Sequence, residues 1–212
     1  MAKKVEEVKI EPIKIEEAVV TIVGDSPLIV HNFDEKTKRQ LLEISMQKAK
    51  KPREPKNPVE DFIRSLHWLT PMPTEFTEEA FEEAIKNGAR FGFPSVGVKA
   101  SAVSGAYRGG YTKDKVSING AFHIIGEFIT INGSVPKMRE DMCRVGMGAP
   151  DIRYRGEYSE WSMTFVIRYN KSAYSLEQIL NFINLGGFSV GIGEWRPEKG
   201  GNNGMFHIAE TK

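Results

Sequence analysis

The 212-residue chain has a single cysteine, few histidines and no long apolar run. Cys143 cannot form an internal disulfide, and it has no CxxC partner that would indicate a zinc or redox site. Because no stretch of about 18 uninterrupted apolar residues exists, the sequence predicts no membrane-spanning helix. The opening stretch MAKKVEEVKI is charged from its third residue, so it lacks the apolar core of a signal peptide. We therefore expect a protein of the reducing cytoplasm.

Signals for metals and cofactors are also missing. The four histidines are scattered without the spacing of a metal site, so each is expected to be packed or solvated: His31, His67, His123 and His207. No Walker-type GK[ST] motif is present, and GIGEWR lacks the third glycine of a dinucleotide fingerprint. The sequence thus predicts neither a metal nor a cofactor. A net charge of +1 leaves nucleic-acid binding open, because such binding depends on local clusters of Lys and Arg.

With 40% apolar and 27% charged residues, the composition is that of a globular protein. The β-branched run at 18–24 predicts a first strand, which DSP ends. Asn57 as N-cap, with Pro58 at the first helical position, predicts a helix over 57–69. A second helix is expected between the acidic turn near 78 and Asn87-Gly88. A third helix, of small residues, is expected from a Ser95 cap to Gly109-Gly110.

The second half of the chain is richer in β signals. Asn119-Gly120 and Asn132-Gly133 predict hairpin turns between strands over 115–136. Residues 136–158 are expected to form a long loop, and 160–169 an alternating strand. The capping box from Ser175 to Gln178 predicts a last helix, and 205–209 predict a closing strand. The order is that of a ferredoxin-like α+β fold, an antiparallel sheet with helices on one face and its other face free. We expect one domain over 1–212, with a helical insertion at about 35–90.

Residues 35–56 of that insertion are the only markedly basic block of the chain. They contain three glutamates and eight cations, which are Lys36, Lys38, Arg39, Lys48, Lys50, Lys51, Arg53 and Lys56. The loop predicted at 136–158 adds Arg144, Arg153 and Arg155, and an extended backbone would point Arg153 and Arg155 to one side, with Tyr154 opposite. Arginines between aromatic residues suit a single-strand groove, since guanidinium groups hold the backbone and rings stack on bases. The alternative is a loop of solvated charges.

The stretch GGFSVGIGEWRPEKGGNNGMFHI, 186–208, contains seven glycines and a GxSxG centred on Ser189. A nucleophile elbow needs a strand before the serine and a helix after it, and here a helix precedes it, so we exclude a hydrolase of that type. We interpret the stretch as a loop that wraps a ligand with main-chain amides, with Arg196 and Lys199 on phosphates and Trp195 stacked on a base. The alternative stays open that the glycines only release the chain from the helix and that Trp195 covers the core.

Three segments in order resemble a known family. VTIVGDSPLIV, FPSVGVKASAVSGAYR and the helix with its glycine-rich loop are similar to parts of the RAMP superfamily, the ferredoxin-like, RNA-binding backbone subunits of CRISPR effector complexes. The second segment resembles Ile-Pro-Gly-Ser-Ser-Leu-Lys-Gly-x-x-Arg and aligns Pro94, Lys99 and Arg108 with it. The chain also resembles small uncharacterised phage-encoded proteins.

The resemblance implies a protein without enzymatic activity that binds single-stranded nucleic acid, RNA in preference to DNA. Copies would lie side by side along the strand, held by a groove on the sheet side, the basic block and the glycine-rich loop. The expected contacts are Lys48, Lys50, Lys51, Arg53, Lys99, Arg108, Arg144, Arg153, Arg155, Gly191, Gly193, Trp195, Arg196 and Lys199. Two alternatives stay open: a phage module that imitates or inhibits a host complex by binding protein, and a metal-dependent endoribonuclease acting near His31 and Asp34.

Overall fold

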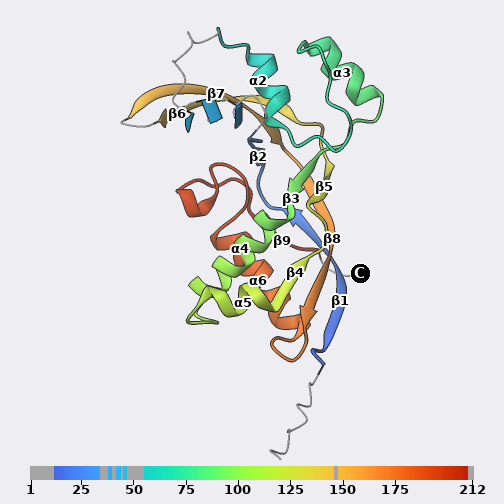
Figure 1. The fold of residues 1–212 in the computed structure, drawn as a ribbon, viewed down its shortest axis with the longest axis vertical. Coiled ribbons are helices and arrows are strands. Elements are labelled where there is room, and N and C mark those ends of the chain that lie inside the picture. The colour runs from blue at the N-terminus through green and yellow to red at the C-terminus, as the bar shows by residue number, and fades with distance from the viewer. Residues whose placement is uncertain are drawn as a thin grey trace, which may run out of the picture.

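The computed structural model describes residues 12–33, 38–39, 42–43, 45–46, 55–145 and 148–209, and all that follows concerns these residues. They form an α+β fold with two antiparallel sheets (Figure 1). The larger sheet has β8 and β1 at its centre and consists of β1 (Ile15–Gly24), β3 (Gly92–Pro94), β4 (Phe122–Ile124), β5 (Phe128–Gly133), β8 (Trp161–Asn170) and β9 (Phe206–Ile208).

The topology of the larger sheet is ferredoxin-like, as predicted. β9 pairs with β1, β1 pairs with β8, and β4 and β5 follow one another along the other edge of β8. The crossing helices are α4 (Ser95–Arg108), between β1 and β4, and α6 (Leu176–Ser189), between β8 and β9. Both helices lie on the same face of the sheet (Figure 1). The chain thus follows the β-α-β-β-α-β order of that fold.

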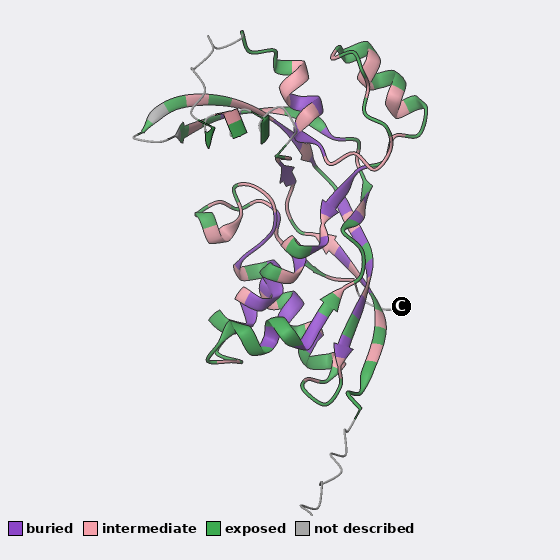
Figure 2. Cartoon of the chain, viewed as in Figure 1, coloured by how far each residue is buried: buried purple, intermediate pink, exposed green. Residues whose placement is uncertain are grey.

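The core lies between this sheet and the two helices (Figure 2). Alternation along β8 turns Trp161, Phe165 and Tyr169 toward the core, and all three are buried. The opposite face of β8 carries Ser162, Thr164, Val166 and Arg168, paired with β1. The free faces of these two central strands therefore offer no aromatic ring on which a base could stack.

Glycines bring the two crossing helices into backbone contact. Gly105 of α4 and Gly186 of α6 are both buried, and a methyl group on Gly105 would lie 2.4 Å from the amide nitrogen of Gly186. Since α6 continues to Ser189, Gly186 and Gly187 are helical, and the predicted loop begins later than expected. Ser189 donates its hydroxyl to the carbonyl of Leu185 at 2.6 Å, as a helical serine does.

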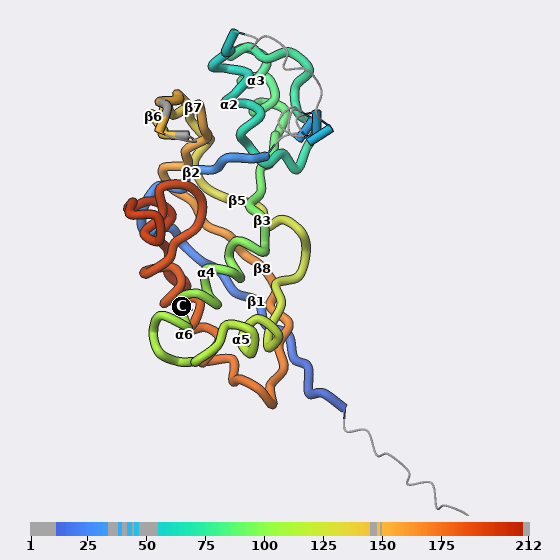
Figure 3. The backbone as a smooth tube through the Cα atoms, turned by 60° about the vertical axis from the view of Figure 1, so that its left-hand side comes forward, coloured from blue at the N-terminus to red at the C-terminus, as the bar shows by residue number. Residues whose placement is uncertain are grey.

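The smaller sheet consists of β2 (Leu28–Val30), β7 (Ala149–Tyr158) and β6 (Lys137–Val145). The helix α2 (Pro58–Ser65) packs on it, and a methyl group on Gly156 of β7 would lie 2.2 Å from a methyl carbon of Leu66. Together with α3 (Glu78–Lys86), the hairpin of β6 and β7 lies at the end of the molecule away from α5 (Lys115–Ala121) (Figures 1 and 3).

The predicted loop over 136–158 is wrong, because these residues form the β6–β7 hairpin in nine paired positions, from Lys137–Glu157 to Val145–Ala149. The sequence hides it because both strands are rich in charged residues, and in β6 the three consecutive charges at 139–141 break the alternation of a half-buried strand. Across the hairpin, Lys137 faces Glu157 and Asp141 faces Arg153, and these opposite charges stabilise the pairing, whereas Arg139 faces Arg155. Arg153 and Arg155 do occupy alternate positions of β7, as an extended backbone requires.

The strand and turn predicted from Lys115 through Asn119-Gly120 are also wrong, because this segment is the helix α5. Asp114 caps it, and its carboxylate accepts from the Ser117 amide at 2.7 Å and from the Ser117 hydroxyl at 2.9 Å. Ile118 is fully buried on the inner face. A capped first turn and a buried anchor outweigh the local turn preference of Asn-Gly.

Other helix signals are confirmed. Asn57 accepts from the amides of Val59 and Glu60 at the start of α2, and both hydrogen bonds of the Ser175–Gln178 capping box are present. The cap predicted at Ser95 is wrong: Pro94 precedes the helix, and the Ser95 hydroxyl donates instead to the carbonyl of Gly126 at 2.6 Å. Among the described residues, no helix has the length and apolarity needed to span a bilayer.

Gly105→Ala should destabilise the protein, because the added methyl group collides with the backbone of Gly186 and neither helix can yield locally. We expect the free energy of unfolding in urea to fall by about 1–3 kcal/mol, as for overpacked cores. Gly120→Ala in α5 is the matched control, since a methyl group there meets no atom within 4 Å. It should leave stability unchanged or raise it by about 0.5–1 kcal/mol. Equal losses in both variants would contradict backbone contact between α4 and α6.

Candidate functional site

A cleft of about 870 Å³ lies between the N-terminal half of α4 and the loop that follows α6. Residues 31–33, after β2, and residues 126–128, before and at the start of β5, complete its rim. Its α4 wall carries small side chains, Gly97, Ala100 and Ser101, so the cleft stays open along the helix. The wall opposite is formed by residues 190–194 of the glycine-rich stretch.

Two exposed aromatic rings line the cleft. The exposed fractions of Phe33 and Phe128 are 50% and 39%. The ring of His67 lies 5.6 Å from that of Phe128, and it also lines the cleft. Burial lowers the pKa of His67 to about 4, and the nearby His31 adds to this effect. His67 is therefore neutral at physiological pH and presents a flat, uncharged ring.

The glycine-rich loop uses many of its amides within the protein. Ile192 donates to the carbonyl of Gly204 at 2.9 Å, Glu194 to Ile29 at 2.9 Å, and Gly204 to Pro27 at 2.8 Å. Gly193, with a φ of 75°, packs so closely on β2 that a methyl group there would lie 2.3 Å from the Ile29 carbonyl oxygen. These glycines therefore dock the loop onto β2, and the amides of Ile192, Glu194 and Gly204 are not available to wrap a ligand.

Two arginines meet at one glutamate beside the cleft. Glu198 pairs with Arg196 and with Arg108 of α4, each at 2.8 Å. Hydrogen bonding from Arg196 is the main cause that holds the pKa of Glu198 below its ordinary value. Arg196 also donates to the carbonyl of Gly193 at 3.0 Å and lines the cleft. The loop thus carries a guanidinium group at the cleft in a fixed orientation.

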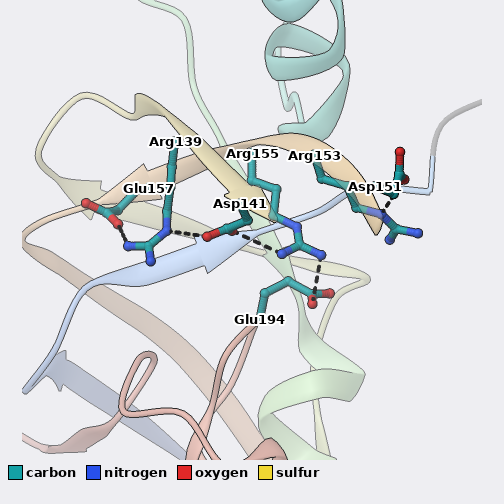
Figure 4. Close-up of polar contacts among 7 residues, drawn as sticks. All are labelled: Arg139, Asp141, Asp151, Arg153, Arg155, Glu157 and Glu194. Atoms are coloured by element: carbon teal, nitrogen blue, oxygen red, sulfur yellow. Dashed lines mark hydrogen bonds and ion pairs between the residues drawn. The ribbon is translucent and has the colours of Figure 1, made fainter. Parts of the chain in front are cut away.

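A chain of ion pairs joins the β6–β7 hairpin to this loop (Figure 4). We call it the arginine ladder: Arg139, Asp141, Arg155, Glu157 and Glu194. Arg139 pairs with Glu157 at 2.5 Å and with Asp141 at 2.9 Å, and Arg155 pairs with Asp141 at 3.0 Å and with Glu194 at 3.3 Å. The exposed fractions of Asp141 and Arg155 are only 6% and 3%, so their pairing is shielded from water.

Asp141 is ionised in spite of its burial. Burial alone would raise its pKa, but hydrogen bonds from Arg139 and Arg155 outweigh that effect and hold the pKa below the ordinary 3.8. Trp195 also hydrogen-bonds to this carboxylate. Because Trp195 has a φ of 51°, the loop backbone is held in the left-handed region, where a non-glycine residue needs such support. The ring remains 38% exposed.

The structure brings only some of the predicted contacts to the cleft. Gly191, Gly193 and Arg196 line it. Arg108 and Arg155 connect to it through Glu198 and Glu194. Lys48, Lys50, Lys51 and Arg53 lie outside the described residues, as does Asp34.

The remaining predicted contacts lie elsewhere. Lys99 faces β4, with its Nζ 3.3 Å from His123 Nδ1, and burial lowers its pKa. Arg144 and Lys199 are exposed. Arg153 pairs with Asp151 at 3.4 Å.

Sequence reasoning missed Phe33, Phe128 and Ser101 as cleft residues. Phe33 lies two residues after His31, in the segment that follows β2, and no local signal marks it. Phe128 begins a strand in which Ile129 and Ile131 are buried, so the sequence indicated only an apolar run. Ser101 was hidden among the small residues of α4, and no local signal marks it.

Comparisons with known proteins give a distant structural likeness. No protein-family model and no curated protein matches the sequence. Among solved structures, the chain is similar to the crystal structure of Cmr6 from Pyrococcus furiosus, with a TM-score of 0.37 and 11% sequence identity. The likeness covers 93% of this chain and 100% of that chain.

Asp141→Asn should destabilise the protein by about 3 kcal/mol, because it leaves the buried Arg155 with only the longer ion pair to Glu194. The folded-state pKa of Asp141 lies below 3.8, so its contribution is present above that pH and is lost as the pH falls through the folded value. Urea unfolding at neutral and acidic pH would measure both effects, and the acid decline should be shallower in the variant.

The control is Glu17→Gln, which breaks the exposed pair with Arg168 at 2.7 Å. It should cost no more than about 1 kcal/mol. A loss in Asp141→Asn no larger than in this control would show that the arginine ladder does not stabilise the fold.

Proposed function

We propose that this protein binds single-stranded nucleic acid, RNA in preference to DNA, in the cleft between α4 and the glycine-rich loop. The observation that carries the proposal is the composition of this cleft. It combines two exposed aromatic rings, Phe33 and Phe128, with Arg196 in one open groove, and Arg196 shares the single carboxylate of Glu198 with Arg108, which leaves one positive charge in excess. Unpaired bases stack on exposed rings whatever their sequence, while cations hold the backbone.

The position of these groups favours the helix side of the molecule over the sheet side. The free faces of β1 and β8 expose hydroxyl, aliphatic and charged side chains, and the charges of Glu17 and Arg168 there are paired. A strand lying in the cleft instead contacts α4, residues 31–33 and the loop after α6 together. Sequence tolerance follows, because rings and backbone contacts read no base edges.

We further propose that copies lie side by side along the strand, as the resemblance to RAMP subunits implies. The β6–β7 hairpin supports this arrangement, because it projects from the body of the molecule (Figure 1). One face of it exposes apolar side chains, with exposed fractions of 43% for Met138, 73% for Met142 and 43% for Ile152. Such a face would be covered by a neighbouring copy in a filament, and stepwise complexes on longer strands would reveal it.

Purified protein should bind a fluorescent oligouridine at low salt, with an affinity that falls steeply as salt is added. Phe33→Ala and Phe128→Ala should each weaken binding by about 1–3 kcal/mol, the contribution of one stacked base. Phe188→Ala on α6 is the control, since this ring is 78% exposed and does not line the cleft. Fluorescence anisotropy measures all four proteins.

Absence of binding at low salt would refute the proposal. Equal affinity in the three phenylalanine variants would move the site away from the cleft. Binding of a host protein that survives nuclease treatment, without affinity for oligouridine, would instead establish the protein-binding module as the function.

A second candidate function is RNA cleavage, which His31 and His67 favour because both line the cleft. With its pKa lowered to about 4, His67 is unprotonated near neutral pH, so it is no proton donor there and only a weak proton acceptor. Incubation of labelled RNA with and without magnesium distinguishes this activity from binding alone. Loss of any cleavage in both His31→Ala and His67→Ala would be needed to assign it to the cleft.

A further inference from the structure

We propose that the open edge of β1, at residues 15–19, pairs with the same edge of a second copy of this chain. The two larger sheets would then form one continuous antiparallel sheet. Such a contact uses the same surface on both copies and has two-fold symmetry. It needs no nucleic acid, so it does not depend on the proposed function. It also differs from the hairpin face described above, which would contact a neighbour along a bound strand.

The edge of β1 is covered along only part of its length. β8 pairs with one side of β1 over residues 15–23, whereas β9 pairs with the other side over 22–24 alone. The last backbone hydrogen bond on the β9 side is donated by the amide of Ala209 to the carbonyl of Thr21 at 2.9 Å. Within the described part of the chain, no strand pairs with this side of residues 15–19, which lie at the margin of the sheet (Figure 1).

The open side presents a regular row of backbone groups. In an antiparallel strand, the amide and carbonyl of one residue point to one side, and those of the next residue point to the other side. The carbonyl of Thr21 faces β9, whereas the carbonyl of Lys14 accepts from Lys171 on the β8 side at 2.9 Å. Even-numbered residues therefore face β8, and odd-numbered residues face outward. The residues that offer both groups to an added strand are Ile15, Glu17 and Val19.

The side chains of this row are two apolar residues with an acid between them. The exposed fractions are 52% for Ile15 and 71% for Val19, so both branched side chains lie in water in the single chain. Glu17 between them is also exposed. β-branched residues favour pairing with another strand, and a neighbouring strand would cover both of them.

The two glutamates at this edge are neutralised within their own sheet. Glu17 pairs with Arg168 of β8 at 2.7 Å. Glu16, on the opposite face, pairs with Lys171 at 2.7 Å, and the hydrogen bond from Lys171 is the main cause that holds the pKa of Glu16 below its ordinary value. Proteins commonly protect edge strands from pairing by placing charges on them. Here the paired charges give little such protection.

The pattern of the edge favours a second copy as its occupant. The row is apolar, acidic and apolar in either direction, so two antiparallel copies place Ile15 opposite Val19 twice, on either side of a central pair of Glu17 residues. β1 begins at Ile15 and β9 blocks the edge at Thr21, so this register alone pairs all three outward residues. The two glutamates face one another, but each is bound to its own Arg168, and the four charges sum to zero.

Sedimentation equilibrium of the nucleic-acid-free protein should show a dimer whose fraction increases with concentration. Val19→Lys should raise the dissociation constant about tenfold or more, because it replaces an apolar pair with Ile15 at both symmetric positions. Val116→Lys is the matched control, since Val116 is 81% exposed on α5. The same change there should leave the dissociation constant unaltered.

A proline variant tests backbone pairing separately from side-chain contact. Val19→Pro removes an amide that points away from β8, so the bonds to β8 remain and the fold should persist, as it does with proline at other sheet edges. The dimer should be lost in Val19→Pro and weakened only slightly in Val19→Ala. Circular dichroism checks that the proline variant is folded, and if it is not, Val19→Lys and the cysteine variants decide.

Cysteine crosslinking tests the register. With Cys143→Ser as the background, Glu17→Cys should form a disulfide between copies on mild oxidation, because directly opposite residues have Cα atoms about 5.5 Å apart. Ile15→Cys is the control from the same strand. Its symmetric mate lies four positions away, about 14 Å along the strand, which is too far for a disulfide.

A protein that stays monomeric at every concentration overturns the proposal, as does a dimer that persists in both Val19→Lys and Val19→Pro. Crosslinking of Ile15→Cys in place of Glu17→Cys overturns the register. Removal of residues 210–212 tests the chain's own end as the occupant, and a monomer that dimerises only after this removal would show the proposal to be wrong. Oligouridine binding is measured separately, so the proposed function can stand or fall without this contact.

Discussion

The backbone contact between Gly105 and Gly186 is the constraint on which the cleft depends. It brings α4 and α6 together on one face of the sheet, and each helix then leads directly into a wall of the cleft. The N-terminal half of α4 forms one wall, and the loop that leaves the end of α6 forms the other. A side chain at either glycine would separate the helices and so change the width of the cleft. Close helix packing and the geometry of the site are therefore one requirement on the sequence.

The arginine ladder provides the second connection, between the smaller sheet and the glycine-rich loop. Arg155 of β7 reaches Glu194 of the loop, and Asp141 of β6 accepts hydrogen bonds from both the hairpin and Trp195. Buried ion pairs stabilise a fold little more than apolar residues would, but breaking one is costly. The main effect of the ladder is therefore geometric, because it fixes how the hairpin lies relative to the loop. Both sheets also contribute to one hydrophobic core, so the ladder adds a fixed connection at its edge.

Much of the fold could be predicted because its signals are local. Asn57 and the Ser175–Gln178 box mark helix starts by hydrogen bonds within four residues. The β-branched run at 18–24 marks β1, and alternation marks β8. The failures were non-local. Asn119-Gly120 has a strong turn preference, but the burial of Ile118 depends on packing against distant segments. Likewise, the charged strands of β6 and β7 make sense only when paired with one another, and no window within one strand contains that information.

The site was harder to predict than the fold because the same residue type serves two purposes. Glycines of the 186–208 stretch were interpreted as the ligand-wrapping part of the site, yet Gly193 and Gly204 let the loop approach its own neighbours. Its amides are largely used there, so donors for a ligand must come from elsewhere in the cleft. The first turn of α4 also lines the cleft, and the first amides of a helix have no acceptor within it. The glycines thus contribute indirectly to the site. They dock the loop on β2 and so fix the wall of the cleft that lies opposite α4.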